Sequence, residues 1–315
     1  MLFKYRINLI FILVLIPLFL FGKGNSTFDF LRIDVGARAA ALGSSFVTSA
    51  NDPNLIFYNP AGLTSLNHQQ LSVGFFKHLL DVNSGYISYG REISDFGFVG
   101  GGIIYINYGE FKRTGEEGQQ LGTYGAGEFL IVAGYGNEVI KDLSYGVNAK
   151  FIYSSIAEVH STAAAIDIGA KYVMIPDRFI LGASILNLGT QIDPYMNTRE
   201  KLPLNLTIGS AIYPEHLPAV IFIDLHRLND YQDNFIKRFK QFSIGVELNA
   251  SENVILRVGY NNERRQELKL GQSSGFAGFS IGGGFVTEKY NIDYGYNSLG
   301  RVGSMHRISV GFRFD

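Results

Sequence analysis

Short runs of alternating apolar and polar residues fill the chain from about Gln69 to Asp315, with turn residues between them. Successive side chains of a strand point to opposite faces of a sheet, so this alternation predicts strands. About fourteen strands are expected, most of about 9–12 residues, which is the length that a tilted strand needs to cross a bilayer. They span residues 69–77, 83–91, 97–108, 125–136, 143–155, 162–174, 178–187, 204–214, 217–227, 238–249, 253–261, 275–286, 289–297 and 304–314.

The alternation gives a predicted strand one apolar face and one polar face. Tyr145, Val147 and Phe151 share one face of their strand, and Asn148 and Lys150 share the other. A soluble β-sandwich shows the same pattern, with its polar face toward water. The pattern alone therefore leaves two folds open, a membrane barrel and a soluble sandwich.

The lengths of the connections separate these two folds. Connections after even-numbered strands are tight, whereas four of those after odd-numbered strands are long and polar, namely 109–124, 188–203, 228–237 and 262–274. Transmembrane barrels have short turns at one end and long loops at the other, and bacterial ones have an even number of strands. The sequence therefore predicts an all-β fold, with residues 69–315 forming a transmembrane antiparallel β-barrel.

The stretch before the strands lacks sustained alternation and is rich in small residues. Ala37–Leu42 are good helix formers, and Gly43 suits the left-handed position that ends a helix. Asp52-Pro53 has the order of an N-cap followed by a first helical residue, and Asn59-Pro60 indicates a turn. We therefore expect short helical turns joined by tight bends.

A barrel of about fourteen strands leaves a bore that must be plugged or it would leak, so residues 25–68 are predicted to fold into it. Arg38 is the lone charge on the alanine-rich turn. Buried charges persist mainly when paired, so a structural ion pair with Asp34 or Asp52 is favoured over a charge that gates a ligand. The residues expected to define the plug are Asp34, Gly36, Arg38, Leu42, Gly43, Asp52, Pro53, Asn59, Pro60 and Gly62.

The composition suits a sheet whose outside faces lipid. Charged residues make up 17% of the chain, below the roughly 25% of soluble domains, and aromatic residues make up 14%. The net charge of −1 argues against nucleic-acid binding, and the absence of cysteine excludes disulfides.

The first residues have the order of a secretory signal peptide. Lys4 and Arg6 precede an apolar run, Ile7–Phe21, and a small-residue cleavage site at residues 22–24. An uncleaved anchor helix is the alternative, but this run is short for a span that needs roughly 20 residues. The prediction is a signal peptide over residues 1–24, export, and insertion into the outer membrane by strands.

No constellation typical of an enzyme emerges, and we expect no catalysis, cofactor or metal. Residues 271–275 have the spelling of a nucleophile elbow, but they lie in a predicted loop before a strand rather than between a strand and a helix. The basic segment 235–240 is placed to meet anionic lipid at the membrane interface. A charged cluster in a predicted outer loop is either a solvated loop or a docking surface for a partner or a lipid headgroup: Glu263, Arg264, Arg265 and Glu267.

Three parts of the sequence resemble the PorV/PorQ family of outer-membrane proteins. The first comprises residues 30–43, 51–55 and 59–63. The second comprises residues 257–261, 264–268 and 277–280 and resembles PorQ in particular. The third is the closing strand, 306–314. The resemblance implies a barrel similar to the FadL channels for hydrophobic compounds, with an amino-terminal hatch in the lumen. It also implies a non-enzymatic role in type IX protein secretion, in which such proteins hold secreted cargo or tether a surface partner, PorZ.

Two functions therefore stay open. One is an interaction protein that docks a PorZ-like surface protein or secreted cargo through its long outer loops, within outer-membrane lipid. The other is a FadL-like channel for hydrophobic small molecules. The Asn, Asp, Lys and Arg residues on the predicted interior faces favour docking over a continuous apolar path.

Overall fold

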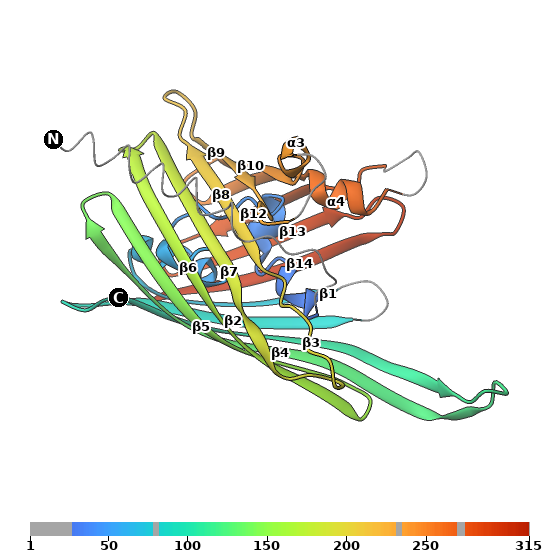
Figure 1. Cartoon of the computed structure of the whole chain (residues 1–315). Helices are drawn as coiled ribbons and strands as arrows, with labels where there is room; N and C mark the ends of the chain where they lie inside the picture. The colour runs from blue at the N-terminus through green and yellow to red at the C-terminus, as the bar shows by residue number, and fades with distance from the viewer. Residues whose placement is uncertain (1–26, 78–81, 231–234, 270–274, 315) are drawn as a thin grey trace.

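Fourteen antiparallel strands form a closed barrel in the computed structural model, which describes residues 27–77, 82–230, 235–269 and 275–314 (Figure 1). The first strand pairs with the last, so the sheet has no open side. The strands are β1 (Gln69–Lys77), β2 (Asn83–Ile93), β3 (Gly97–Thr114), β4 (Gln120–Ile140), β5 (Leu143–Ile156), β6 (Val159–Ile175), β7 (Phe179–Asp193), β8 (Asn205–Ile212), β9 (Ala219–Leu225), β10 (Phe242–Asn249), β11 (Val254–Asn261), β12 (Phe279–Val286), β13 (Tyr290–Ser298) and β14 (Ser304–Phe314). The predicted fold class is confirmed, and the predicted signal peptide lies outside the described residues.

The predicted loop 109–124 is wrong in its extent, because β3 and β4 continue through most of it. A bulge between Asn107 and Glu110 interrupts the pairing, which then resumes and runs to Thr114 opposite Gln120. We call residues 110–125 the arm, and Figure 1 shows it projecting well beyond the rest of the barrel. The sequence does not predict this extension of β3 and β4, because a two-stranded ribbon with solvent on both faces needs no hydrophobic alternation.

The strands differ greatly in length around the barrel. Strands β3–β7 have 14–21 residues, whereas β8–β12 have 7 or 8. The predicted loop 188–203 is likewise partly strand, since β7 runs to Asp193. The predicted loop 262–274 contains the short helix α4 (Asn262–Glu267), and α3 (Phe235–Arg238) lies between β9 and β10. Both helices lie at the end with the long connections, the outer end (Figure 1).

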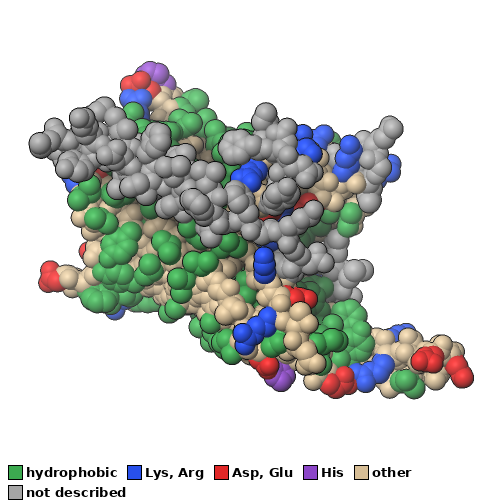
Figure 2. All heavy atoms as spheres, in the orientation of Figure 1, with side chains coloured by type: hydrophobic (Ala, Val, Ile, Leu, Met, Phe, Trp, Pro, Cys, Tyr) green, Lys and Arg blue, Asp and Glu red, His purple; other side chains and the backbone are tan. Residues whose placement is uncertain are grey.

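The outside of the barrel is apolar, and the inside of the wall is polar. Val258 and Ile281 on the outer face are 54% and 57% exposed, while Arg257 beside them points inward and is 2% exposed. Hydrophobic side chains cover much of the side visible in Figure 2. Among the described residues, no helix is long and apolar enough to cross a membrane.

The amino-terminal segment forms four short helical turns inside the barrel. They are η2 (Asp29–Arg32), α2 (Ala37–Ala41), η3 (Pro53–Phe57) and η4 (Pro60–Ser65). Asp52 caps η3 by accepting a hydrogen bond from the Asn54 amide (2.9 Å), and Asn59 caps η4 in the same way through Ala61. Each cap precedes a proline whose missing N–H costs nothing at that position. We call Thr27–Leu66 the plug.

The plug contacts the wall through glycines. A Cβ added to Gly146 of β5 would stand 2.3 Å from the Pro60 carbonyl carbon, and one on Gly259 of β11 would stand 2.2 Å from the Gly43 nitrogen. Real Cβ atoms do not approach backbone so closely, and glycine in a strand often marks such an approach. The glycines of the wall therefore let the plug backbone lie directly against the strands.

Candidate functional site

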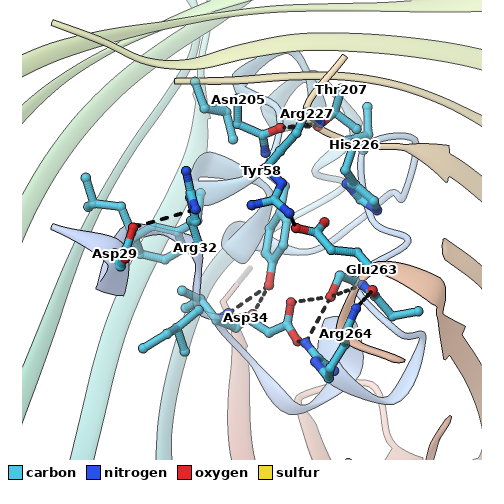
Figure 3. Close-up of a pocket in the computed structure, with 18 of the residues that line it drawn as sticks. Asp29, Arg32, Asp34, Tyr58, Asn205, Thr207, His226, Arg227, Glu263 and Arg264 are labelled. Carbon is cyan, nitrogen blue, oxygen red and sulfur yellow. Dashed lines mark hydrogen bonds and ion pairs between the residues drawn. The ribbon is translucent and has the colours of Figure 1, made fainter. Parts of the chain in front are cut away.

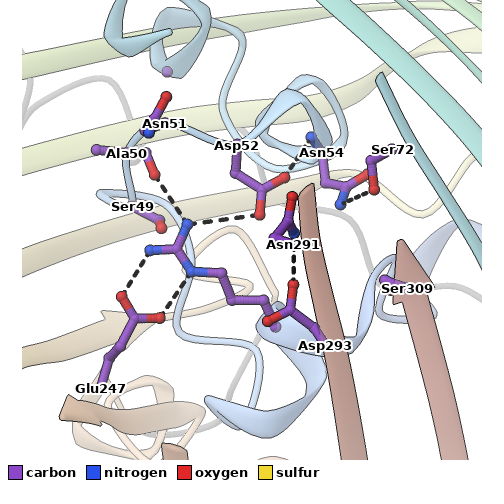
Figure 4. A network of polar contacts seen from close by, with 12 residues as sticks. Ser49, Ala50, Asn51, Asp52, Asn54, Ser72, Glu247, Asn291, Asp293 and Ser309 are labelled. Atoms are coloured by element: carbon purple, nitrogen blue, oxygen red, sulfur yellow. Dashed lines mark hydrogen bonds and ion pairs between the residues drawn. The ribbon is translucent and has the colours of Figure 1, made fainter. Parts of the chain in front are cut away.

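An ion network joins the plug to the wall near the inner end, where the tight turns lie. Arg38 of α2 donates two hydrogen bonds to Glu247 of β10, from Nε to Oε2 and from Nη2 to Oε1, both 2.8 Å long. Arg257 of β11 donates to the same Glu247 (2.7 Å) and to Asp293 of β13 (2.6 Å). Figure 4 shows Glu247 and Asp52 on either side of the central guanidinium and Asp293 close by. We call these five residues the lower network.

The two predicted partners of Arg38 behave differently. Asp52 lies 3.6 Å from Arg38 Nη1, so the expected pair forms but is secondary to Glu247. Asp34 does not pair with Arg38. Burial raises the pKa of Asp52, and the nearby Arg38 only partly opposes this. Glu247 was missed because it lies 209 residues away in sequence.

Asp34 instead joins the plug to the outer helix α4. Its Oδ2 accepts from Arg264 Nη2 (2.6 Å), and its Oδ1 accepts from the Ser44 hydroxyl (2.5 Å). Burial alone would raise the pKa of Asp34, but Arg264, Arg307 and these hydrogen bonds hold it below its usual value. Asn261 caps α4 at the Arg264 amide (2.9 Å) and also donates to the Gly43 carbonyl (3.1 Å). The start of α4 is thus fixed to the plug at two points.

The other predicted plug residues hold its internal geometry. Gly36 (φ +88°) and Gly43 (φ +66°) flank α2 in conformations that favour glycine, and Leu42 is fully buried. Asn59 donates to the carbonyls of Val47 (2.9 Å) and Ala170 (3.1 Å). Pro53 and Pro60 begin η3 and η4, and Gly62 packs against Leu55.

A cavity of about 450 Å³ lies between the plug and the outer end of the barrel (Figure 3). Apolar side chains from the plug and the wall form part of its lining: Leu31, Ile33, Val35, Phe57, Ile104, Leu130, Leu186 and Met305. Polar side chains also line the cavity, and among them Tyr58 both accepts from the Val35 amide (2.7 Å) and donates to its carbonyl (2.9 Å). The cavity is therefore amphipathic.

The charged cluster of the predicted outer loop divides between the two sides of α4. Glu263 and Glu267 line the cavity and pair with Arg227, the latter at 3.0 Å, while Arg264 turns inward to Asp34. Arg265 does not line the cavity. Burial lowers the pKa of Arg227, and Asp230 and Glu267 oppose the shift. A docking role for the cluster stays a prediction.

Arg307 is a further residue that the sequence analysis did not single out. It lies in β14, lines the cavity, and is 1% exposed. Its Nη1 donates to Asn297, and its guanidinium lies 5.3 Å from the Phe76 ring centre, but Nε and Nη2 have no hydrogen-bond acceptor among the described residues. Alternation places Arg307 on the interior face. Its missing acceptor shows only in three dimensions.

The fold and the site together define a plugged transmembrane β-barrel whose lumen holds an amphipathic cavity at its outer end. A model of a family described as uncharacterised (UPF0164) matches residues 21–173 of the chain. No curated protein sequence matches it.

Solved structures of similar fold include two toluene transporters and a FadL homologue, all of low sequence identity. The toluene transporter TodX of Pseudomonas putida is 13% identical with a TM-score of 0.59, over 89% of this chain and 98% of that one. The toluene transporter TbuX of Ralstonia pickettii is 12% identical with a TM-score of 0.60, over 89% and 98%. A FadL homologue of Pseudomonas aeruginosa is 10% identical with a TM-score of 0.53, over the same shares. At this identity the likeness concerns the fold.

Proposed function

We propose that this protein is an outer-membrane channel that admits small hydrophobic molecules, above all those with an acidic group. The cavity carries the proposal: about 450 Å³ lies within the range of small-molecule sites, roughly 300–1,000 Å³. Its apolar side suits a hydrocarbon body. The Nε and Nη2 groups of Arg307 suit an anionic head, because buried N–H groups of a cation that lack an acceptor are costly. The FadL-like fold and the predicted export signal support the outer-membrane location.

Binding of a matched ligand series tests this function. Decanoate, decanol and toluene are titrated into the purified barrel in detergent by calorimetry. We expect all three to bind, with decanoate tightest, and Arg307→Gln to weaken decanoate about tenfold or more while sparing decanol, since a hydrogen bond to a charged group contributes about 1.5–3 kcal/mol.

A cavity-filling variant separates the site from the lipid-facing wall. Leu186→Trp fills the cavity and is expected to lower the binding of all three ligands, together with their uptake by cells. Leu256→Trp on the exposed outer face is the matched control, since Leu256 is half exposed and does not line the cavity. Equal binding by wild type and Leu186→Trp would show that the ligands do not bind in the cavity.

A second candidate function is docking of a secreted or surface protein, as the PorV/PorQ resemblance implies, and the arm favours it. Pairing of β3 with β2 ends at Asn107, and pairing of β4 with β5 ends at Ala126. The Gly125 carbonyl still accepts from the Ala157 amide (3.0 Å), and beyond this bond neither edge of the arm pairs with a described strand. Open strand edges accept an added strand from a partner. Phe111 and Tyr124 stack with ring centres 5.5 Å apart, which stiffens the arm.

Replacing residues 110–125 by an Asn-Gly turn tests docking. Co-purification of a PorZ-like surface protein or of type IX cargo with wild type, and its loss from the shortened barrel, is the expected result. Retention of the partner by the shortened barrel would rule out the arm as the docking site. The same variant is expected to keep decanoate binding, because no arm residue lines the cavity.

A further inference from the structure

A row of aromatic side chains crosses the lipid-facing side of the short strands β8–β12, at the outer ends of three of them. Phe242 of β10 lies 6.0 Å from Tyr260 of β11 between ring centres, and Tyr260 lies 5.0 Å from Phe279 of β12. Phe276 continues the row at 6.3 Å from Phe279 and is 76% exposed. Aromatic belts of barrels lie at the level of the lipid headgroups. The row therefore marks the outer membrane interface on this side.

The helices α3 and α4 lie directly beyond the aromatic row. Asn262 at the start of α4 accepts from the Tyr260 hydroxyl (2.9 Å) and donates to the Lys240 carbonyl just after α3 (2.7 Å). The Lys240 amide in turn bonds to the Lys237 carbonyl (3.1 Å). Short strands thus bring both helices down to the level of the headgroups.

Helix α4 divides its charged side chains between two sides. Glu263, Arg264 and Glu267 face the lumen, where they meet Arg227 and Asp34. Residue 265 is roughly on the opposite side of a helix from these positions. Arg265 packs next to the aromatic row, since a Cβ on Gly278, the residue before Phe279, would stand 3.1 Å from Arg265 Cβ.

Basic side chains gather on the two helices and directly after them. Figure 2 shows Lys and Arg side chains concentrated over α3 and α4. Four of them make no ion pair with any described acidic residue and form what we call the rim patch: Lys237, Lys240, Arg265 and Lys269. The acidic residues of α4 are engaged on its other side, so they do not neutralise the rim patch.

We propose that the rim patch binds the phosphate groups of an outer-leaflet lipid whose acyl chains lie along the apolar wall. The charge is complementary to phosphate, and the aromatic row fixes the depth at which a headgroup meets the patch. Ile244, Val258 and Ile281, all exposed on the wall below, provide the apolar surface for the chains. Each cation near a charged lipid surface contributes about 1 kcal/mol, about a fivefold change in affinity.

Lipid binding to the full barrel tests the proposal. Native mass spectrometry in detergent counts bound diphosphoryl lipid A, monophosphoryl lipid A and phosphatidylcholine. We expect affinity to fall in that order. The double variant Lys240→Gln/Arg265→Gln is expected to lose about 25-fold for diphosphoryl lipid A and little for phosphatidylcholine. Phe276→Ala is expected to weaken all three lipids alike.

The control variant removes two cations from the opposite end of the barrel. Lys141→Gln/Lys289→Gln lies in inner turns and is expected to leave lipid A binding unchanged, with the same difference in gel migration between the unheated and the heated barrel as in wild type. Equal loss in both double variants would overturn the proposal, as would equal affinity for all three lipids. Displacement of lipid A by millimolar inorganic phosphate would assign the patch to free phosphate and overturn the lipid assignment.

Discussion

Asp34 of the plug and Arg264 of α4 are joined by an ion pair of 2.6 Å, although they lie 230 residues apart in sequence. Asp34 is 4% exposed, so the pair is largely shielded from water. The ion pair connects the plug to the connection between β11 and β12 at the outer end. A displacement of α4 therefore acts directly on the plug and on the cavity that both of them line.

Breaking this pair is expected to loosen the outer half of the plug. Arg264→Gln leaves the Asp34 carboxylate without its main partner, and removing one member of a buried pair typically costs about 3–5 kcal/mol. Hydrogen exchange of residues 29–36 should accelerate, while that of η4 should stay slow. Arg265→Gln, one residue further on, is the matched control. Unchanged exchange in Arg264→Gln would show that the plug is held without the pair.

His226 gives the barrel a dependence on pH. Burial lowers its pKa to about 4, and Arg227 and Arg264 act in the same direction against Asp34. An unfolded histidine has a pKa near 6.5, so the unfolded chain binds the proton first as the pH falls. The stabilisation by neutral His226 is complete above about pH 6.5 and is lost as the pH falls toward 4.

Urea unfolding of the barrel in lipid vesicles checks this prediction. The midpoint is expected to fall between pH 7.5 and pH 5 in wild type and to fall less in His226→Gln. His226 also bonds the Ser243 hydroxyl at 2.7 Å, which the amide of Gln is able to retain. His216→Gln in an exposed inner turn is the control and should follow wild type. The same pH slope in all three proteins would contradict the assignment.

The lower network is expected to behave as one unit. Glu247 bonds both Arg38 and Arg257, so Glu247→Gln leaves two buried cations undercompensated. Arg38→Gln removes a partner from Glu247, which still has Arg257, and the secondary partner from Asp52. We expect Glu247→Gln to be the more destabilising, each by about 3–5 kcal/mol, with a coupling of about 1–3 kcal/mol in the double variant.

Unfolding midpoints of the two single variants and the double variant give this coupling. The exposed pair Arg178–Glu215 is the control, and its removal should change the midpoint little, because surface ion pairs contribute little. Strict additivity of Arg38→Gln and Glu247→Gln would contradict a shared network.

Close contact at Gly146 predicts a steric effect on the plug. Gly146→Ala places a methyl group within 2.4 Å of the Ala61 nitrogen and should displace η4, at a cost of about 1–3 kcal/mol. Gly101→Ala on the same sheet is the control, since its Cβ meets nothing closer than 3.6 Å. Exchange of the η4 amides distinguishes the two, and slow exchange in both would mean that the contact is easily relieved.

The sequence predicts the barrel well because lipid on one side and a polar lumen on the other force a period of two. The alternation of Val147 and Phe151 with Asn148 and Lys150 matches the outer and inner faces of β5. The caps at Asp52 and Asn59 are equally readable, since an N-cap and a following proline are local signals.

Less of the site can be predicted from the sequence, because its contacts join residues that are distant in sequence. Alternation puts Arg307 and Asp293 in the lumen, but it does not show that Asp293 meets Arg257 while Arg307 keeps free N–H groups. The pairing of Arg38 with Glu247 likewise depends on where α2 meets β10. The arm was missed for another reason, since a two-stranded ribbon in water carries no hydrophobic period.

The unequal strand lengths give the barrel an oblique mouth. Eight residues of β10 span about 26 Å, whereas twenty-one of β4 span about 69 Å. The tall side screens the entrance from one direction, and the low side leaves it close to the membrane surface. A solute already dissolved among the lipids would thus travel a shorter distance to the mouth, over β8–β12, than one that arrives from bulk water over the arm.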